Sequence, residues 1–290
     1  MNIITIDLED WFHLLNHPLT DNEESWDNFE SRLRQNLDRV LALLDNSDNI
    51  ATFFCLGWVA RKYPEIVKEI SSLGHEIGSH SNSHQLISSH DRNFFRNDLE
   101  ISIKSLEDLT GKKVISYRAP GFSLVNSTVW VFEELVKQGI EYDCSIFLGN
   151  HSHGARIKSF GLSPSIINIE GMRIKEFPVN SFKFFNKEIP FSGGGYFRLL
   201  PYQIIKRLMR ISNYNMAYFH PRDFDKDQPV LSDLSYFRLF KSYYGLKSSY
   251  PKAVKFFDDF DFITLSQADK LIDWSNAQQF SLINGNLKQH

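Results

Sequence analysis

The chain has 290 residues, of which 42% are hydrophobic and 23% charged, as is typical of a globular protein with one large α/β domain or two small ones. Its formal net charge of −3 argues against a nucleic acid or an anionic membrane as partner, because both require a basic surface. No window approaches the roughly 18 apolar residues of a membrane span. No basic leader precedes the first apolar run, and the two cysteines, Cys55 and Cys144, lie in apolar surroundings. We therefore expect a soluble, cytoplasmic protein with buried free thiols.

Strand-like and helix-like stretches alternate along most of the chain. Short apolar runs predict strands at residues 3–6, 51–56, 75–79, 116–118, 142–146, 216–220 and 262–265. Helical periodicity, with Pro64 in a first turn and Gly74 or Gly111 as a stop, is the second signal. It predicts helices at residues 28–45, 64–73, 92–110, 127–138, 201–211 and 232–244 or beyond.

This alternation predicts an α/β fold with a central parallel sheet wrapped by helices. The pattern loosens around residues 147–195, where we expect a small irregular insertion with a hairpin at 166–178. The string Gly193-Gly194-Gly195-Tyr196 lacks the ending of a phosphate loop and predicts a turn feeding the next helix, with Arg198 near a substrate. We interpret residues 1–275 as a single domain and the polar residues 276–290 as a frayed tail.

Two histidines four residues apart, His80 and His84, follow the strand predicted at 75–79. Imidazole is a preferred ligand for zinc and neighbouring divalent metals, and one helical turn or a tight loop can aim both side chains at one ion. The first strand ends in three acids within four residues, Asp7, Glu9 and Asp10, whose mutual repulsion a cation or a proton would relieve. One acid can complete the metal ligands while another acts as a base.

Five motifs, in chain order, resemble those of the polysaccharide deacetylase family, also called the NodB-homology or carbohydrate esterase 4 family. They are T-x-D at Thr5–Asp7, H-[ST]-x-x-H at His80–His84, R-x-P at Arg118–Pro120, an aspartate motif at Tyr142-Asp143 and a histidine motif at Tyr218-Phe219-His220. The resemblance covers about residues 1 to 266. The strings YRAPGFS, GGGYFRLLP and YFHPRDFD are similar to a subfamily found with exopolysaccharide and exosortase gene clusters.

The resemblance implies a distorted (β/α) barrel with a divalent metal at the carboxyl ends of the strands. Zinc is the expected metal, with cobalt, nickel and manganese as alternatives. The implied reaction is hydrolysis of an N-acetyl group on an N-acetylated carbohydrate by activated water. His80 and His84 match the family's metal ligands, Asp7 matches its general base, and His220 matches its general acid.

Other positions match supporting roles in the family. Arg118 matches a residue that keeps the base carboxylate ionised by pairing with it. Asp143 is expected to orient either the acid or Arg118. A backbone N–H at Gly121 or Phe122 is expected to stabilise the tetrahedral oxyanion.

The third metal ligand is where this chain departs from the family. Many members carry T-F-D-D, whose second aspartate is the ligand, whereas this chain has Asp7-Leu8-Glu9-Asp10. Strand alternation places Asp7 and Glu9 on one face, which favours Glu9. A turn at this point would instead present Asp10, so both acids remain candidates.

Two other functions are compatible with the fold. Allantoinase-like and cyclic-imide hydrolases share it, but several of them lack the metal histidines that this chain retains. A non-catalytic carbohydrate-binding relative would lack a ligand, a base or an acid. His151 and His153 lie in an irregular stretch, where a plain loop or a substrate contact is favoured over a second metal site. The missing export signal favours a nucleotide- or lipid-linked sugar precursor as substrate, and the sequence gives no indication of the oligomeric state.

Overall fold

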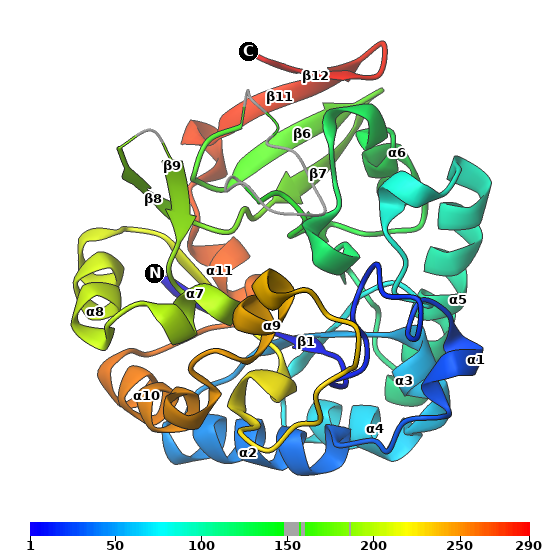
Figure 1. Ribbon diagram of the computed structural model, residues 1–290. Coiled ribbons are helices and arrows are strands. Elements are labelled where there is room, and N and C mark those ends of the chain that lie inside the picture. Colours follow the sequence, from blue (N-terminus) through cyan, green and yellow to red (C-terminus); the bar gives the residue numbers. More distant parts are fainter. Residues whose placement is uncertain (148–156, 158–159, 186) are drawn as a thin grey trace.

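A sheet of ten strands runs through the computed structural model, which describes residues 1–147, 157, 160–185 and 187–290 (Figure 1). The strands follow the order β10-β1-β2-β3-β4-β5-β7-β6-β11-β12. They are β1 (Asn2–Leu8), β2 (Thr52–Cys55), β3 (Glu76–Ser79), β4 (Ser116–Tyr117), β5 (Tyr142–Asp143), β6 (Ser165–Ile169), β7 (Met172–Glu176), β10 (Asn215–Phe219), β11 (Gln278–Ile283) and β12 (Asn286–Gln289).

Most neighbouring strands are parallel, and only the β6–β7 and β11–β12 pairs of this sheet are antiparallel. The α/β class with a central, mostly parallel sheet is therefore confirmed. The order has two ends, at β10 and β12, so the described strands form an open series and no closed barrel is seen among them. A separate hairpin pairs β8 (Ser181–Phe184) with β9 (Lys187–Pro190).

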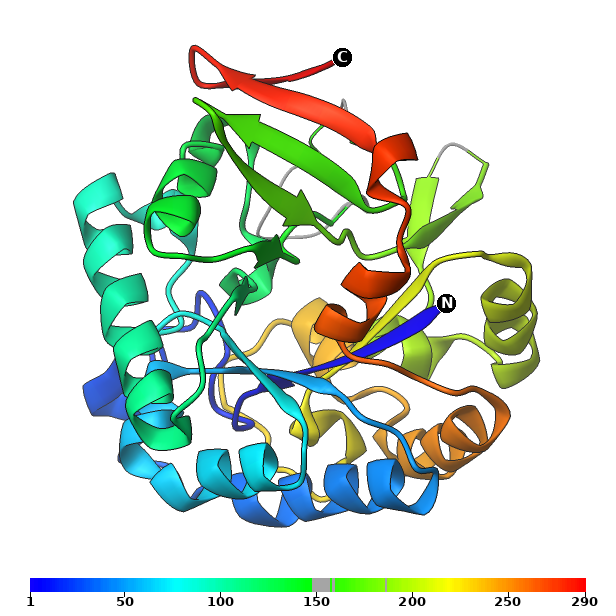
Figure 2. The ribbon, with the colours of Figure 1, turned by 180° about the vertical axis from the view of Figure 1, so that it is seen from behind.

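Helices cover the sheet, and α10, α2, α4 and α5 form an arc around one end of the molecule, with β11 and β12 at the other end (Figures 1 and 2). The helices are α1 (Glu23–Trp26), α2 (Leu33–Asn46), α3 (Gly57–Lys62), α4 (Pro64–Ser72), α5 (Arg92–Thr110), α6 (Val131–Lys137), α7 (Gly194–Leu199), α8 (Tyr202–Ile211), α9 (Tyr236–Tyr243), α10 (Leu246–Asp259) and α11 (Leu265–Leu271). Short 3₁₀ turns are η1 (Ile87–Ser89), η2 (Pro120–Phe122), η3 (Asn126–Thr128), η4 (Pro221–Phe224) and η5 (Trp274–Asn276). No helix in the described ranges is both long enough and apolar enough to cross a membrane.

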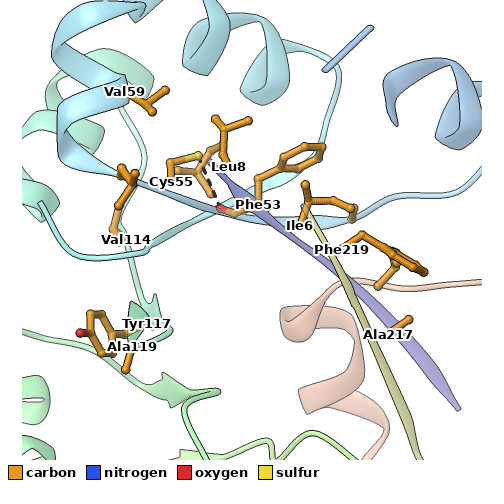
Figure 3. Packing of buried hydrophobic residues seen from close by; sticks show 14 of the residues in the cluster. Ile6, Leu8, Phe53, Cys55, Val59, Val114, Tyr117, Ala119, Ala217 and Phe219 are labelled. Carbon is orange, nitrogen blue, oxygen red and sulfur yellow. Dashed lines mark hydrogen bonds between the residues drawn. The ribbon is translucent and has the colours of Figure 1, made fainter. Parts of the chain in front are cut away.

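The core lies between the parallel strands and their helices. From Ile3 to Leu8, strand β1 is buried, and β2 and β10 are buried along their whole length, as expected for strands covered on both faces. Figure 3 shows side chains of β1, β2 and β10 packed in one cluster, with the Cys55 thiol directed at the Phe53 carbonyl. Cys55 and Cys144 are buried and free, as predicted, and burial raises the pKa of both thiols well above its ordinary value.

Two terminal predictions are wrong. Residues 276–290 are not a frayed tail, because β11 pairs with β6 and then turns back to pair with β12. Phe280 is fully buried there and anchors a segment that is otherwise polar. The strand predicted at 262–265 reduces to a single bridge between Ile263 and Ile3, since Thr264 caps α11 by accepting the N–H of Gln267.

Other elements agree with the sequence to different degrees. Helix α5 has the predicted bounds, with Asp91 as its N-cap and Gly111 at φ 65° as its C-cap. The predicted hairpin at 166–178 is confirmed as β6–β7, which joins the main sheet through β5. Helix α2 begins at Leu33 rather than at residue 28, because the Asp10 carboxylate accepts the N–H groups at that point. His151 and His153 lie outside the described residues.

Candidate active site

The candidate site lies at the carboxyl ends of neighbouring parallel strands, where α/β folds commonly bind ligands. Asp7 and Glu9 stand at the end of β1, His80 follows β3, Arg118 follows β4, and His220 follows β10. All of these predicted residues except His220 are buried, and His220 is partly buried. The parallel pairing therefore brings residues far apart in the chain to one edge of the sheet.

Glu9 meets both histidines of the H-x3-H pair. Its Oε1 lies 2.9 Å from His80 Nε2 and 2.9 Å from His84 Nε2. Burial acts to raise the pKa of Glu9, but His84, His220 and the hydrogen bonds from the two imidazoles outweigh it and lower the pKa well below its ordinary value. The three groups form a compact set that could hold a metal ion.

The histidine pair lies on a tight loop rather than on a helix. Ser81 and His84 adopt left-handed backbone angles, with φ of 68° and 54°. The Asp98 carboxylate of α5 accepts the backbone N–H groups of Asn82 and Ser83 at 2.8 and 3.0 Å. Asp98 thus fixes the loop between the two histidines, and nothing in the local sequence marks it for this role.

The tautomer of His80 is set by its second nitrogen. Nδ1 lies 2.8 Å from the carbonyl oxygen of Arg118, which can only accept, so Nδ1 carries a proton and donates it. Nε2 then either carries a second proton that it donates to Glu9 or, in the neutral ring, directs a lone pair towards the carboxylate, where a bound cation would relieve the repulsion. A divalent metal fits this donor set, because an outer hydrogen bond on Nδ1 is the usual partner of an Nε2 ligand.

Asp7 is held by the fully buried guanidinium of Arg118. Arg118 Nη1 donates to Asp7 Oδ1 at 2.7 Å and to Thr5 Oγ1 at 2.8 Å. The same guanidinium lies over the Phe54 ring, 4.4 Å from its centroid, and its Nε donates to the Cys144 carbonyl at 3.3 Å. Asp7 Oδ2 is left facing His220 Nε2 at 3.7 Å.

His220 is oriented by Asp223 from the η4 turn. Its Nδ1 lies 3.0 Å from Asp223 Oδ2, and its Nε2 lies 3.9 Å from Glu9 Oε1. Burial lowers the pKa of His220, but Glu9, Asp223 and Asp7 outweigh it and raise the pKa to about 9. Asp223 is itself paired with Arg198, and its pKa is lowered because Arg198 and His220 outweigh its burial.

Asp10 faces away from the histidines and stabilises the start of α2. Its oxygens accept the N–H groups of Trp11, Arg32 and Leu33 and the Ser31 hydroxyl. Burial raises the pKa of Asp10 in spite of these bonds. The contact explains why α2 begins at Leu33, and among the described residues Asp10 belongs to neither potential metal cluster.

Asp143 lies near the Arg118 turn and not against His220. It accepts the backbone N–H and the hydroxyl of Ser145, and that hydroxyl accepts the N–H of Ala119 next to Arg118. Burial raises the pKa of Asp143, and burial together with the Asp143 charge and hydrogen bond raises the pKa of Glu176 well above its ordinary value. The raised pKa favours the protonated form of Glu176, which can donate a hydrogen bond to Asp143.

The two predicted oxyanion donors differ in their surroundings. The Phe122 N–H already donates to the Ala119 carbonyl at 3.0 Å. Gly121, at φ 59°, lines the cleft that also contains Glu9, His84 and His220. This cleft has a volume of about 400 Å³, within the range of small-molecule sites.

Sequence reasoning missed the supporting residues Asp98, Asp223 and Glu176, and also His13. The His13 ring is buried among aromatic side chains, 5.8 Å from the His84 ring between centroids. Its Nδ1 accepts the Asp10 N–H at 3.1 Å. Only Asp223 had a local signal, since it follows His220 by three residues in a turn opened by a proline.

Two family models match consecutive segments of the chain. The family model described as polysaccharide deacetylase matches residues 21–141, which include His80, His84 and Arg118. The chain carries a polysaccharide deacetylase domain. A second model, described as a domain of unknown function (DUF3473), matches residues 144–270, which include His220. The site therefore combines both matched segments with the strand that precedes them.

Individual relatives match over shorter stretches. A peptidoglycan-N-acetylglucosamine deacetylase of Bacillus cereus is 35% identical over 97 residues, covering 33% of this chain and 35% of that protein. A peptidoglycan deacetylase of Helicobacter pylori is 33% identical over 110 residues, covering 38% of this chain and 36% of that protein. Each match thus spans about a third of the curated relative.

The fold is shared more widely. A solved structure from Mycobacterium smegmatis, classed as a polysaccharide deacetylase, superposes with a TM-score of 0.63 at 19% identity. The superposition covers 95% of this chain and 91% of that one. This likeness shows that both chains have the same fold.

Proposed function

We propose that this protein is a metal-dependent hydrolase that removes the N-acetyl group from an N-acetylated sugar of a surface polysaccharide or its precursor. The observation that supports it most is the convergence of Glu9 and the two loop histidines with an Arg-paired aspartate and an Asp-oriented histidine. A general base, a general acid and a metal-ligand set within a few ångströms are what amide hydrolysis requires. The matches to two peptidoglycan deacetylases support the same reaction class.

Glu9, His80 and His84 are the proposed metal ligands, with zinc as the proposed ion. Ligand atoms about 2.0–2.1 Å from a tetrahedral zinc lie about 3.3 Å apart, close to the 2.9 Å that separates Glu9 Oε1 from each Nε2. When bound, the metal would supply Lewis acidity to the acetamide carbonyl and to the attacking water.

The protein's own residues move the protons. The free Oδ2 of Asp7 accepts a proton from the attacking water, while Arg118 holds Oδ1 and fixes the direction of the carboxylate. The resulting tetrahedral oxyanion accepts the Gly121 N–H from the cleft wall. His220 Nε2 then donates a proton to the sugar nitrogen, which leaves as an amine together with acetate. Asp223 holds His220 Nδ1 so that Nε2 points into the cleft.

Acetate release tests this proposal. The wild-type protein, loaded with zinc, should release acetate from an N-acetylglucosamine oligomer and should not open the rings of allantoin or hydantoin. Asp7→Asn should still bind the oligomer but lose turnover by about 10²-fold or more, the usual contribution of a general base.

Each alternative function has a distinct outcome in the same assay. Ring opening without acetate release would replace the deacetylase with a cyclic-amide hydrolase. Sugar binding with no turnover by the wild type towards any N-acetylated sugar would indicate a non-catalytic binding protein. The cytoplasmic location, the single-domain boundary and the exopolysaccharide subfamily remain predictions.

A further inference from the structure

The cleft beside the proposed metal site has an uneven charge. Four arginine and lysine side chains line it: Arg198, Arg222, Arg238 and Lys241. The carboxylates that line it are Glu9 and Asp223, and both are engaged, Glu9 with the two histidines and Asp223 with Arg198 and His220. Arg222, Arg238 and Lys241 therefore have no carboxylate partner within 4 Å among the residues described. This excess of positive charge lies in a chain whose net charge is −3.

Arg222 is the most informative of the three, because it is only 7% exposed. A guanidinium has five N–H donors, and the recorded bond of this one is from Nη1 to the Trp11 carbonyl at 3.2 Å. Burying a guanidinium without a counter-charge destabilises the folded protein. A buried, unpaired arginine at this position is therefore better explained by a role in binding than by a role in stability. A substrate oxyanion within the cleft would provide the missing counter-charge.

Helix α9, near the centre of Figure 1, contributes the other two cations and an aromatic ring. Arg238 and Lys241 are three residues apart and therefore share one helical face. Arg238 donates to the carbonyls of Leu15 and Asn16 at 2.6 and 2.7 Å, and all three residues line the cleft. Phe237 lines the same cleft while 74% exposed, as a ring that stacks on a sugar would be.

A purely structural role explains only part of this arrangement. Arg238 joins α9 to the loop at residues 15–16, and a neutral donor could make the same two bonds. Lys241 makes no hydrogen bond through its ammonium in the part of the chain that the structure describes, although its carbonyl accepts from Arg198 at 2.8 Å. Lys241 is exposed, and desolvation at the cleft wall together with the neighbouring Arg238 charge lowers its pKa.

We propose that the cleft binds an oxyanion of the substrate, a phosphate or a carboxylate adjacent to the acetamido sugar, through Arg222, Arg238 and Lys241. The proposal rests on the deacetylase function proposed above and narrows its substrate to an anionic N-acetylated sugar. A phosphate would belong to a nucleotide- or lipid-linked sugar, and a carboxylate to an acidic sugar next to the acetamido residue.

The test compares three probes with the zinc-loaded full chain: a neutral N-acetylglucosamine oligomer, N-acetylglucosamine 1-phosphate, and a disaccharide of N-acetylglucosamine with a uronic acid. Lys241→Gln removes one cation without breaking a recorded side-chain bond, and Lys247→Gln on the exposed side of α10 is the matched control. We expect KM for at least one anionic probe to rise about 10-fold or more in Lys241→Gln, with kcat unchanged. KM for the neutral oligomer should not change, and the control should resemble the wild type.

Binding of the same probes, measured by calorimetry in 50 and 300 mM salt, separates this proposal from the deacetylase function itself. If an anionic probe binds more tightly than the neutral oligomer, and the gain falls with salt and with Lys241→Gln, the oxyanion site stands even when no acetate is released. The anionic probe that shows this gain identifies phosphate or carboxylate as the group. Equal affinity for all three probes, or an equal effect of Lys241→Gln on neutral and anionic probes, overturns the proposal.

Discussion

Glu9 and Asp10 are adjacent acids with opposite expected roles, and neutralising each in turn separates metal binding from fold stability. In Glu9→Gln, the proposed metal set loses its only carboxylate, while the side chain keeps its size. In Asp10→Asn, the metal set is intact, but the support for the start of α2 is weakened. Glu9→Gln should therefore lose metal binding, whereas Asp10→Asn should lose stability of the fold.

The size of the Asp10 effect follows from its hydrogen bonds. Oδ1 accepts from Trp11 N at 2.8 Å, and Oδ2 accepts from Leu33 N at 3.2 Å and from the Ser31 hydroxyl. An asparagine can present an oxygen on one side only, so at least one buried donor loses its partner, at about 1–3 kcal/mol. Loss of the charge near the first turn of α2 adds about 0.3–1 kcal/mol. Because relief of carboxylate burial offsets part of this, we expect a net loss of about 2 kcal/mol.

The assay is urea unfolding with and without zinc at about 100 times its Kd, which should stabilise the wild type by about 2.7 kcal/mol. Asp10→Asn should lower the free energy of unfolding both with and without zinc. It should keep the zinc increment, which is the rise in the free energy of unfolding when zinc is added. Glu9→Gln should lose the increment, because removing a direct ligand weakens binding more than the 10–100-fold typical of an outer partner. An Asp10→Asn protein without the increment, beside a Glu9→Gln protein that retains it, would refute the assignment of Glu9.

Three further substitutions test the supporting residues. Asp223→Asn should lower kcat about 10–100-fold with little change in KM, because it frees the ring of His220, and Asp223→Glu should recover part of the loss; an unchanged kcat would remove the positioning role. Asp98→Asn should weaken zinc binding about 10–100-fold in a competition titration, since it loosens the histidine loop, whereas an unchanged Kd would show that the loop holds its shape alone. Glu176 has a pKa raised well above its ordinary value, so the stability it contributes is complete below about pH 4.3 and is lost as pH rises towards its folded pKa. The free energy of unfolding should therefore fall by up to about 1.4 kcal/mol per pH unit in that window, and Glu176→Gln should remove this slope; equal slopes in both proteins would contradict the shared proton with Asp143.

The strands and the reactive residues were predictable because their signals are local. Apolar runs gave β1, β2, β3 and β10, and parallel strands necessarily place the residues that follow them at one edge of the sheet. The two-residue alternation of a strand was also informative. It put Asp7 and Glu9 on one face, and the structure places both within 4 Å of His220 Nε2.

What the sequence did not show depends on contacts between distant segments. Asp98 lies on α5, yet it fixes a loop some fifteen residues earlier in the chain through two backbone N–H groups. The start of α2 is set by Asp10 across more than twenty residues, so no local signal at residues 28–33 could reveal it. The polar C-terminal segment forms β11 and β12 because the backbone pairing of β11 with β6, and of β12 with β11, needs no apolar pattern beyond Phe280.

The central claim is that one metal ion, held by Glu9, His80 and His84, is required for acetate release. Its most direct test is to strip the purified protein with a chelator, then titrate zinc back while counting bound metal and measuring acetate released from an N-acetylated sugar that the untreated protein hydrolyses. The account predicts that activity disappears on stripping and returns in proportion to zinc, up to one ion per chain. Full activity in the stripped protein, or activity that does not follow the bound metal, would contradict it.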